Sequence, residues 1–394
     1  MNGFESKRLV IGVTGGVAAY KAAELVRLLV KAGAVVDVVL TEAGAQFVGA
    51  ATFQALTGRP VWQGLWDERM NNGMAHIDLT RGAALLLVAP ATADFIAKLS
   101  HGFADDLLST LCLARTCPLL VAPAMNRQMW ESPPTVRNVA QLRSDGVTIL
   151  GPTYGAQACG ETGDGRLLEA TELFADLHAF LQPKLLAGKR ILLTAGPTFE
   201  PLDPVRGLTN SSSGKMGFAL ARACTEAGAD VTVVAGPVGL PTPRGVARVD
   251  VQSALQMRNA VLQRVASADV FIGVAAVADF RPVQNAAHKI KKGAAKMTLE
   301  LELNPDILAE VALLERPPFC VGFAAETSDL ETYAEGKRIS KKLGLVVGNL
   351  VQNGLGGDSN AVTLFDAHGA HVLPMASKAK IAQNIVAHLA KLIE

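Results

Sequence analysis

Three polar side chains in the first half of the chain have the right types for acid–base chemistry. Cys159 lies in the segment ACGETGDGR, which holds too much glycine for a packed core, so an exposed and usable thiol is expected there. His76 lies in GMAHIDL and Asn126 in PAMNRQMW. A lone histidine is more often structural, and an asparagine at this place could equally cap the helix that follows. The three residues are candidates whose roles need further evidence.

The second half opens on a long polar loop at 194–217, TAGPTFEPLDPVRGLTNSSSGKMG, between the apolar run RILLT and a helix expected at 216–227. Backbone amides at the start of a helix favour an anion. The loop is not a Walker A loop, because Gly207 and Gly214 are too far apart and Met216 stands where Ser or Thr is required. An ordinary connection between strand and helix is the alternative.

Both halves repeat the order strand, glycine turn, helix, strand. In the first half, strands are expected at 9–14 and 35–41 around a helix at 17–32; in the second half, strands are expected at 190–194 and 231–235. The apolar segments LLLVAPATAD and VFIGVAAVAD form a further matching pair, each expected to be a strand that ends in small residues and an Asp. Such βαβ units build parallel sheets. The sequence therefore predicts an α/β fold with two tandem Rossmann-like parallel-sheet domains, the first of them flavodoxin-like.

The join between the halves is expected in QPKLLAGK, where Pro183 ends a helix and Gly188 precedes a new strand. We expect domains at 1–186 and 187–394. The segment between them is short for a flexible linker.

Composition limits the classes of function. The 394 residues are 49% hydrophobic with a net charge of +1, which fits a globular protein with ample core and gives no reason to expect nucleic acid. The N-terminal apolar run is too short for a signal peptide, and no stretch approaches a membrane span. Five cysteines show neither metal-site spacing nor a disulfide pattern, so a cytoplasmic location is expected.

Ligands of open parallel sheets bind beyond the carboxyl ends of the strands. In the first domain there is no G-x-G-x-x-G motif, so a dinucleotide is not favoured. A glycine turn can hold one phosphate, threonines can add hydroxyls, and the small residues of APATAD admit a flat ring. A mononucleotide such as FMN fits this pattern, although glycine turns also serve packing. The residues expected at the cofactor are Gly15, Gly16, Thr41, Ala89, Ala91, Thr92 and Met125.

Taken in order, the motifs resemble one known family. They are GVTGGVAAYK, HIDL, APATADFIAKL, PAMNRQMW, ACGETGDGR, TAGPTFEPLDPVR, TNSSSGKMG, AAVADF, KIKK, NPDIL and GFAAET. They are similar to those of the bacterial bifunctional phosphopantothenoylcysteine decarboxylase/phosphopantothenate–cysteine ligase, over nearly the whole chain. The resemblance implies two steps of coenzyme A biosynthesis. The first is CTP-dependent ligation of 4'-phosphopantothenate with L-cysteine through an acyl-cytidylate, and the second is FMN-dependent decarboxylation to 4'-phosphopantetheine.

For the decarboxylase domain, the resemblance implies one role for each of the three candidates. Cys159 resembles the family's proton donor, His76 its active-site base and Asn126 the residue that holds the substrate carboxylate. The protein orients the substrate while the flavin supplies the redox chemistry.

For the ligase domain, the resemblance places Lys289, Lys337 and Lys341 on CTP, with Mg²⁺ or Mn²⁺ as the accompanying metal; it gives no metal ligands. Lys337 and Lys341 lie four residues apart on one expected helix face. Without the resemblance, such a basic run would be read as a solvated surface. Asn210 is implied in the attack by cysteine, and Arg206 is a candidate partner for the substrate phosphate. The other residues implied around CTP are Gly273, Val274, Ala275, Asp279, Pro305, Asp306, Ile307, Leu308 and Phe323.

The resemblance also implies small-molecule substrates and homo-oligomers, with trimers of the first domain and dimers of the second. Two alternatives stay open. A flavin prenyltransferase would leave the ACGETGDGR loop and the second half unexplained. A non-catalytic flavoprotein that binds a partner would be expected to lack His76, Asn126 or Cys159, and all three are present.

Overall fold

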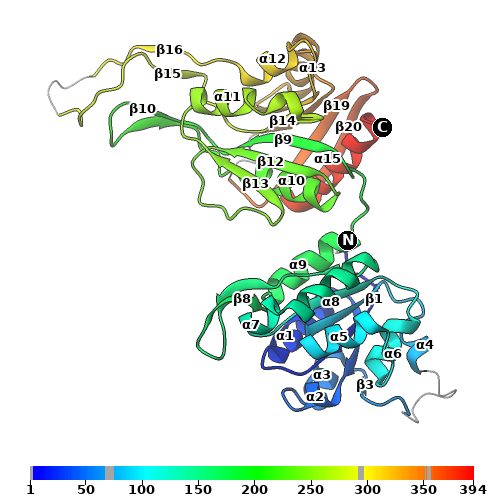
Figure 1. Cartoon of the computed structure of the whole chain (residues 1–394). Coiled ribbons are helices and arrows are strands. Elements are labelled where there is room, and N and C mark those ends of the chain that lie inside the picture. Colours follow the sequence, from blue (N-terminus) through cyan, green and yellow to red (C-terminus); the bar gives the residue numbers. More distant parts are fainter. Residues whose placement is uncertain (1–2, 67–74, 292–296, 351, 353–355) are drawn as a thin grey trace. The chain divides into compact units, whose positions relative to one another are not determined.

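The computed structural model divides into two compact units, which we call unit 1 (Met1–Gln182) and unit 2 (Pro183–Glu394) (Figure 1). Leu186 is fully buried in the core of unit 2. The limits expected from the sequence, 1–186 and 187–394, remain a prediction. None of the described helices is long and apolar enough to cross a membrane. The structure describes residues 3–66, 75–291, 297–350, 352 and 356–394.

Unit 1 is built on a six-stranded sheet in the order β3-β2-β1-β4-β5-β6, with every pairing parallel. Without the short edge strand β3, this is the flavodoxin order. The predicted fold class is confirmed. The strands are β1 (Arg8–Val13), β2 (Val35–Leu40), β3 (Val61–Trp62), β4 (Leu85–Ala91), β5 (Leu119–Pro123) and β6 (Thr148–Ile149).

Helices cover both faces of this sheet, which is why its central strands are apolar throughout. On α1, the buried positions Ala22, Leu25, Val26 and Leu29 follow the helical period. One core layer packs α1 (Ala19–Lys31), α3 (Ala50–Thr57) and α9 (Ala170–Leu181), and the other packs α5 (Ala93–His101), α6 (Leu107–Ala114) and α8 (Pro133–Ser144). The shorter elements are α2 (Glu42–Ala45), α4 (Ala75–Asp78), α7 (Arg127–Glu131) and the hairpin of β7 (Thr153–Ala156) and β8 (Thr162–Arg166).

Unit 2 has an eight-stranded sheet in the order β13-β12-β9-β14-β17-β18-β19-β20. The pairings are parallel as far as β18, and β19 and β20 are antiparallel. The sequence reading did not foresee this antiparallel edge, which a tight turn forms without a crossover helix. The strands are β9 (Arg190–Ala195), β12 (Asp230–Ala235), β13 (Val246–Asp250), β14 (Val270–Gly273), β17 (Phe319–Glu326), β18 (Leu345–Leu350), β19 (Ser359–Asp366) and β20 (Gly369–Ser377).

Helices cover both faces of this sheet as well. The core layer that includes α10 (Lys215–Glu226) and α15 (Lys378–Leu392) lies on one side; the layer with α11 (Ala254–Leu262), α12 (Ile307–Ala312) and α13 (Leu330–Ser340) lies on the other. Gly217 lets α10 approach β9 closely, since an added Cβ would come within 2.6 Å of the Ala195 Cβ. Two hairpins extend beyond the sheet: β10 (Phe199–Pro201) with β11 (Gly207–Thr209), and β15 (Phe280–Pro282) with β16 (Leu301–Leu303).

Two expectations about local structure were wrong. The connection at 194–217 is not an irregular loop throughout, because β10 and β11 pair within it. The segment LLLVAPATAD is a strand only as far as Ala91, since the Thr92 side chain accepts a hydrogen bond from the Phe95 amide and starts α5. In VFIGVAAVAD, the strand ends at Gly273.

Candidate active sites

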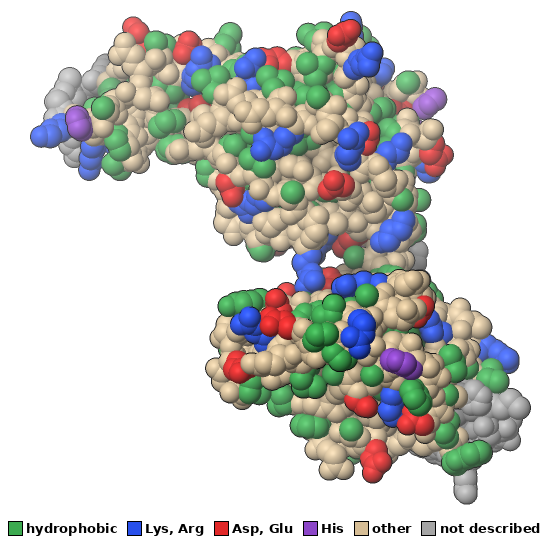
Figure 2. Space-filling model, viewed as in Figure 1, with side chains coloured by type: hydrophobic (Ala, Val, Ile, Leu, Met, Phe, Trp, Pro, Cys, Tyr) green, Lys and Arg blue, Asp and Glu red, His purple; other side chains and the backbone are tan. Residues whose placement is uncertain are grey.

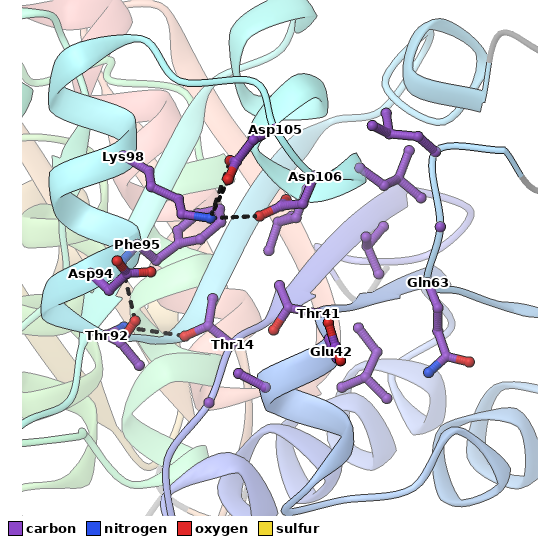
Figure 3. Close-up of a pocket in the computed structure, with 18 of the residues that line it drawn as sticks. Thr14, Thr41, Glu42, Gln63, Thr92, Asp94, Phe95, Lys98, Asp105 and Asp106 are labelled. Carbon is purple, nitrogen blue, oxygen red and sulfur yellow. Dashed lines mark hydrogen bonds and ion pairs between the residues drawn. The ribbon is translucent and has the colours of Figure 1, made fainter.

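A hollow of about 540 Å³, the threonine hollow, lies beyond the carboxyl ends of β1, β2 and β4 in unit 1 (Figure 3). Its lining includes the predicted Gly15, Thr41 and Thr92. Thr14, which the sequence reading missed, connects two of the loops: its hydroxyl donates to the Pro90 carbonyl at 2.7 Å and accepts from the Thr92 amide at 3.2 Å. The expected cofactor positions on three strands therefore come together at one sheet edge.

The threonine hollow suits a mononucleotide. Thr41 and Thr92 each cap a helix, accepting from the Gly44 and Phe95 amides at 3.1 Å. The positive end of the α5 dipole therefore faces the hollow. Apolar side chains, including Leu40 of β2, form another wall, as a flat ring requires. These groups fit FMN.

One side of the threonine hollow is acidic. Lys98 pairs with Asp105 at 2.8 Å and with Asp106 at 3.5 Å, as Figure 3 shows. The hydrogen bond to Asp105 raises the pKa of Lys98, against the opposing effect of burial. This lysine is therefore already neutralised by its neighbours. The sequence signal for the pair is the segment FADDLL, in which Asp106 caps α6.

A second hollow of about 530 Å³, the cysteine hollow, brings together Gly16, Met125, Asn126 and Cys159. Cys159 lies exposed between β7 and β8, with its Sγ 3.9 Å from the Gln157 Oε1 and 3.8 Å from the Glu161 Oε2. Because Gly15 lines the threonine hollow and Gly16 lines the cysteine hollow, the two meet at the glycine turn.

Asn126 caps α7, which is the structural role that the sequence allowed as an alternative to a catalytic one. Its Oδ1 accepts from the Met129 amide at 3.0 Å at the start of α7, and its Nδ2 donates to the Gln128 Oε1 at 2.8 Å. Its implied contact with a substrate carboxylate remains a prediction. Lys21, which the sequence reading missed, is buried and donates to the Leu167 carbonyl and the Glu169 carboxylate, both at 3.0 Å. It fixes the chain that follows β8 against α1.

Three predicted residues are not found in these hollows. His76 falls within α4, but its side chain lies outside the described part of the structure. Ala89 and Ala91 are fully buried in the core layers on the two faces of β4. They line neither hollow as the described residues define them, so a contact with a flavin would have to use their backbone.

In unit 2, a hollow of about 610 Å³, the lysine hollow, collects most of the residues expected at CTP. It lies beside β14 and β17, and α12 and α13 supply part of its wall. The sequence reading missed Thr194 and Asn304 there. The predicted residues that line it are Gly273, Ala275, Asp279, Pro305, Asp306, Ile307, Leu308, Phe323, Lys337 and Lys341.

Lys337 lies on α13 and Lys341 directly follows this helix, and the two lysines differ in their surroundings. Lys337 donates to the Phe323 carbonyl at 2.5 Å, and its pKa is lowered first by burial and then by the nearby Lys341. Lys341 forms an ion pair with Asp306, the residue that caps α12. Burial acts to raise the pKa of Asp306, but the hydrogen bonds from Lys341 and the Ala309 amide bring it below its usual range.

A smaller hollow of about 190 Å³, the amide hollow, lies at the start of α10. Its lining includes Val274, Ser213, Asn360 and Lys378. The buried Asn360 Oδ1 has no hydrogen-bond partner among the described residues. Burial, and then the nearby Lys215, lower the pKa of Lys378. A helix N-terminus with lysines beside it suits an anion.

The remaining ligase candidates lie along the β10–β11 hairpin and the segment after β15. Asn210 donates to the Ala276 carbonyl at 2.9 Å, and Ala276 lines the amide hollow. Arg206 donates to the Ile290 carbonyl at 2.9 Å, and Lys289, next to Ile290, is exposed. As far as the described residues define the lysine and amide hollows, Arg206 and Lys289 line neither of them.

Asp203 holds these two segments together. Its buried carboxylate accepts from the amides of Val205, Arg206 and Ile290 at 2.8, 2.9 and 3.1 Å. Burial acts to raise the pKa of Asp203, but these hydrogen bonds outweigh it and the pKa lies below its usual range. The position of Lys289 is therefore tied to the hairpin that precedes Asn210.

Comparison with known proteins assigns both units. Residues 3–182 match the Flavoprotein family model, and residues 186–393 match the model of the DNA/pantothenate metabolism flavoprotein C-terminal domain. The chain is 51% identical over 392 residues to the Coenzyme A biosynthesis bifunctional protein CoaBC of Vibrio cholerae, covering 98% of each chain. It is 48% identical to that of Escherichia coli K12, covering 96% of each, and 44% identical to that of Bacillus subtilis, covering 98% of this chain and 97% of the relative.

These matches run through both halves, which neither alternative reading explains, and they confirm the resemblance seen in the motifs. The chain belongs to the family of the Coenzyme A biosynthesis bifunctional proteins CoaBC.

Proposed function

We propose that this chain makes 4'-phosphopantetheine in two consecutive reactions. In unit 2, the carboxylate of 4'-phosphopantothenate attacks the α-phosphate of CTP and pyrophosphate leaves. The amine of L-cysteine then attacks the acyl-cytidylate, so that an amide forms and CMP leaves. In unit 1, phosphopantothenoylcysteine loses carbon dioxide. Figure 2 shows basic and acidic side chains interspersed on the visible face, which suits small-molecule substrates better than nucleic acid.

The arrangement of the two hollows in unit 2 supports the ligase reaction most directly. Ala275 and Phe323 line both the lysine hollow and the amide hollow. CTP in the first and the phosphate of phosphopantothenate in the second would bring the carboxylate and the α-phosphate together beside these shared residues. In this arrangement Lys337 and Lys341 meet the triphosphate, while the amides at the start of α10, with Lys215 and Lys378, meet the substrate phosphate.

The hairpin segment would complete the ligase site. Asn210, held against Ala276, lies beside the amide hollow, where cysteine would attack the acyl-cytidylate. Arg206 lies in the turn of the hairpin, and Lys289 lies on an exposed segment that Asp203 ties to that turn. Their contact with nucleotide or substrate requires that segment to approach the hollows when ligands bind.

In unit 1, FMN would occupy the threonine hollow and the substrate the cysteine hollow, with the glycine turn between them. FMN supplies the two-electron oxidation and the matching reduction that make decarboxylation possible. Thr41 and Thr92 hold the cofactor, Asn126 orients the substrate carboxylate, and Cys159 donates a proton from its exposed thiol. His76 acts as the base.

Mg²⁺ or Mn²⁺ would enter the ligase reaction with CTP, because a triphosphate needs charge neutralisation as pyrophosphate leaves.

The chain also forms homo-oligomers in this proposal, as trimers through unit 1 and dimers through unit 2. Val17 and Tyr20 line the cysteine hollow and are 59% and 58% exposed, which suits covering by another copy. In unit 2, Leu301 and Leu303 of β16 are exposed apolar side chains on a hairpin beyond the sheet. Light scattering of the purified chain measures its mass.

The test is the release of pyrophosphate by the purified chain. Release should require CTP, phosphopantothenate and a divalent metal. When L-cysteine is added, the chain should form phosphopantothenoylcysteine. The protein should be yellow and should then form 4'-phosphopantetheine and carbon dioxide. Pyrophosphate release without phosphopantothenate, or a colourless protein that retains no flavin, would contradict the proposal.

A further inference from the structure

A cluster of two histidines and a carboxylate lies at the antiparallel edge of unit 2, among residues that line none of the four hollows described above. Asp366 ends β19, His371 lies on β20 and His388 lies on α15. Figure 1 shows these three elements together near the C-terminus. One ligand atom from each of the three side chains lies within 4.8 Å of the other two.

Both imidazoles point at one carboxylate oxygen. The His388 Nε2 is 2.6 Å from the Asp366 Oδ2, and the His371 Nε2 is 3.2 Å from the same atom. The ring centroids of the two histidines are 4.7 Å apart. Convergence of two ring nitrogens on one buried anion is the donor set that Zn²⁺ and its neighbours in the transition series bind.

Two of the three spacings between the ligand atoms are close to those of a metal site. Zn²⁺ binds imidazole nitrogen and carboxylate oxygen at roughly 2.0–2.2 Å in a tetrahedron, which places neighbouring ligand atoms roughly 3.3–3.5 Å apart. The contact of Asp366 with His371 nearly meets this value, and that with His388 would need to open by less than about 1 Å. Three protein ligands leave one tetrahedral position for water.

The carboxylate is held in place by groups that a metal would leave intact. The side chain of Asp366 is 1% exposed, and its Oδ1 accepts from the His368 backbone amide at 2.7 Å in the turn before β20. The side chains of His371 and His388 are 41% and 20% exposed, so an ion can reach them from solvent. The anion is thus fixed and the two imidazoles can adjust around it.

We propose that Asp366, His371 and His388 bind one divalent transition-metal ion, with Zn²⁺ as the best match to the donor set. The ion joins the β19–β20 hairpin to the C-terminal helix. The site is separate from the Mg²⁺ or Mn²⁺ that accompanies CTP, because hard cations prefer oxygen ligands. It stabilises the folded chain, since the unfolded chain does not hold the three ligands together.

The test uses the full chain, treated with chelator and dialysed, and titrated with Zn²⁺ alone in a calorimeter. Every sample carries Cys159→Ser so that the exposed thiol does not compete. We expect one tight Zn²⁺ per chain. His371→Ala and His388→Ala should weaken binding by at least about tenfold, as loss of a ligand does. His288→Ala, which removes an exposed histidine elsewhere in unit 2, should leave binding unchanged.

Thermal unfolding gives a second measurement. The melting temperature should rise with Zn²⁺ concentration in the parent and in His288→Ala, and should not rise in His371→Ala. Because His371 is well exposed, that variant should fold even if His388→Ala does not. Equal Zn²⁺ affinities in the parent and His371→Ala, or no tight Zn²⁺ at all, would overturn the proposal and leave the cluster as a hydrogen-bonded ion pair only.

Discussion

The two units place their hollows at the same sheet edge but line them with different chemistry. In the threonine hollow of unit 1, Lys98 is the one lysine among the described lining residues and is paired with Asp105 and Asp106, and hydroxyls and backbone amides face the space. In the lysine hollow of unit 2, Lys337 donates only to a backbone carbonyl in the described structure, with Lys341 beside it. In our proposal, hydroxyls and amides thus meet the flavin, and the triphosphate meets two lysines, of which Lys341 is already paired with Asp306.

The side chains that we propose to react also lie in different surroundings. Cys159 lies on the β7–β8 hairpin, directly at the cysteine hollow. Arg206, in the turn of the β10–β11 hairpin, and Lys289, beyond β15, lie outside the two hollows of unit 2, and Asp203 ties their two segments together. We therefore expect a single substitution in unit 1 to affect one step of a reaction whose site is already assembled. In unit 2, single substitutions should affect the two steps of the ligase differently, because Lys289 and Arg206 reach the hollows only if their segments approach when ligands bind.

The largest expected effect is that of Cys159→Ser. In the proposed mechanism, oxidation and loss of carbon dioxide precede the protonation, and a hydroxyl is a far weaker acid than a thiol. Formation of 4'-phosphopantetheine should fall by roughly 10²–10⁴-fold. The variant should release a product two hydrogens short, detectable by mass spectrometry, while pyrophosphate release by unit 2 stays at the parent rate.

Cys224→Ser is the matched control, because that thiol is fully buried in unit 2 and lies in no hollow described here. It should spare decarboxylation in whatever fraction of the protein folds. Fully reduced product from Cys159→Ser at the parent rate would remove the thiol from the mechanism.

The next effect separates the two steps of the ligase. Lys289→Gln should slow acyl-cytidylate formation by roughly 10²–10³-fold, because it removes a charge that we propose approaches the leaving pyrophosphate when ligands bind. Asn210→Asp should spare that step and block the attack by cysteine, so the acyl-cytidylate accumulates. The measurement is CTP consumption without cysteine, followed by product analysis after cysteine is added. Equal loss of CTP consumption in both variants would refute this division of roles.

The sequence was informative where the chemistry depends on residues at the ends of strands. Thr41 and Thr92 follow apolar runs, so the sheet rule brought them together correctly. The sequence did not predict the roles of Thr14 and Lys21, because these roles arise from contacts with Pro90 and Glu169, which lie far away in the chain. The antiparallel edge at β19 and β20 was also missed, because alternating strands without a helix between them give no βαβ signal.

A smaller effect is expected at Lys337, and its sign follows from burial. The pKa of this ammonium lies below the ordinary lysine value, and only the charged form attracts CTP. CTP affinity should therefore fall as pH rises through that lowered pKa, at a pH below the ordinary value of about 10.4. Lys337→Arg should remove this pH dependence, and Lys337→Met should weaken CTP binding about tenfold at neutral pH.

Lys391→Met, at the exposed end of α15, is the control for general loss of charge. It should leave both the affinity for CTP and its pH profile unchanged, as measured by titration calorimetry. A Lys337→Arg variant with the same pH profile as the parent would show that another group titrates.

The smallest effect is expected at Thr41. Thr41→Val removes both the hydroxyl in the threonine hollow and the cap of α2, and should weaken FMN binding by a few fold, on the order of 1 kcal/mol. Thr41→Ser keeps the hydroxyl and should bind FMN like the parent. Quenching of FMN fluorescence on titration into apoprotein measures both. Equal affinities for the valine and serine variants would exclude the hydroxyl from cofactor binding.

The central claim is that each unit holds its own active site, and the most direct test is to produce the chain as two fragments divided between Gln182 and Pro183. A cut between Leu186 and Ala187 would remove Leu186 from the core of unit 2, where it is fully buried and its amide donates to the Ala227 carbonyl. We predict a yellow first fragment that decarboxylates phosphopantothenoylcysteine without CTP. The second fragment should be colourless and should make that compound from phosphopantothenate, cysteine and CTP. Mixing the two should restore formation of 4'-phosphopantetheine. A second fragment that is folded but inert until it is rejoined to the first would contradict independent active sites in the two units.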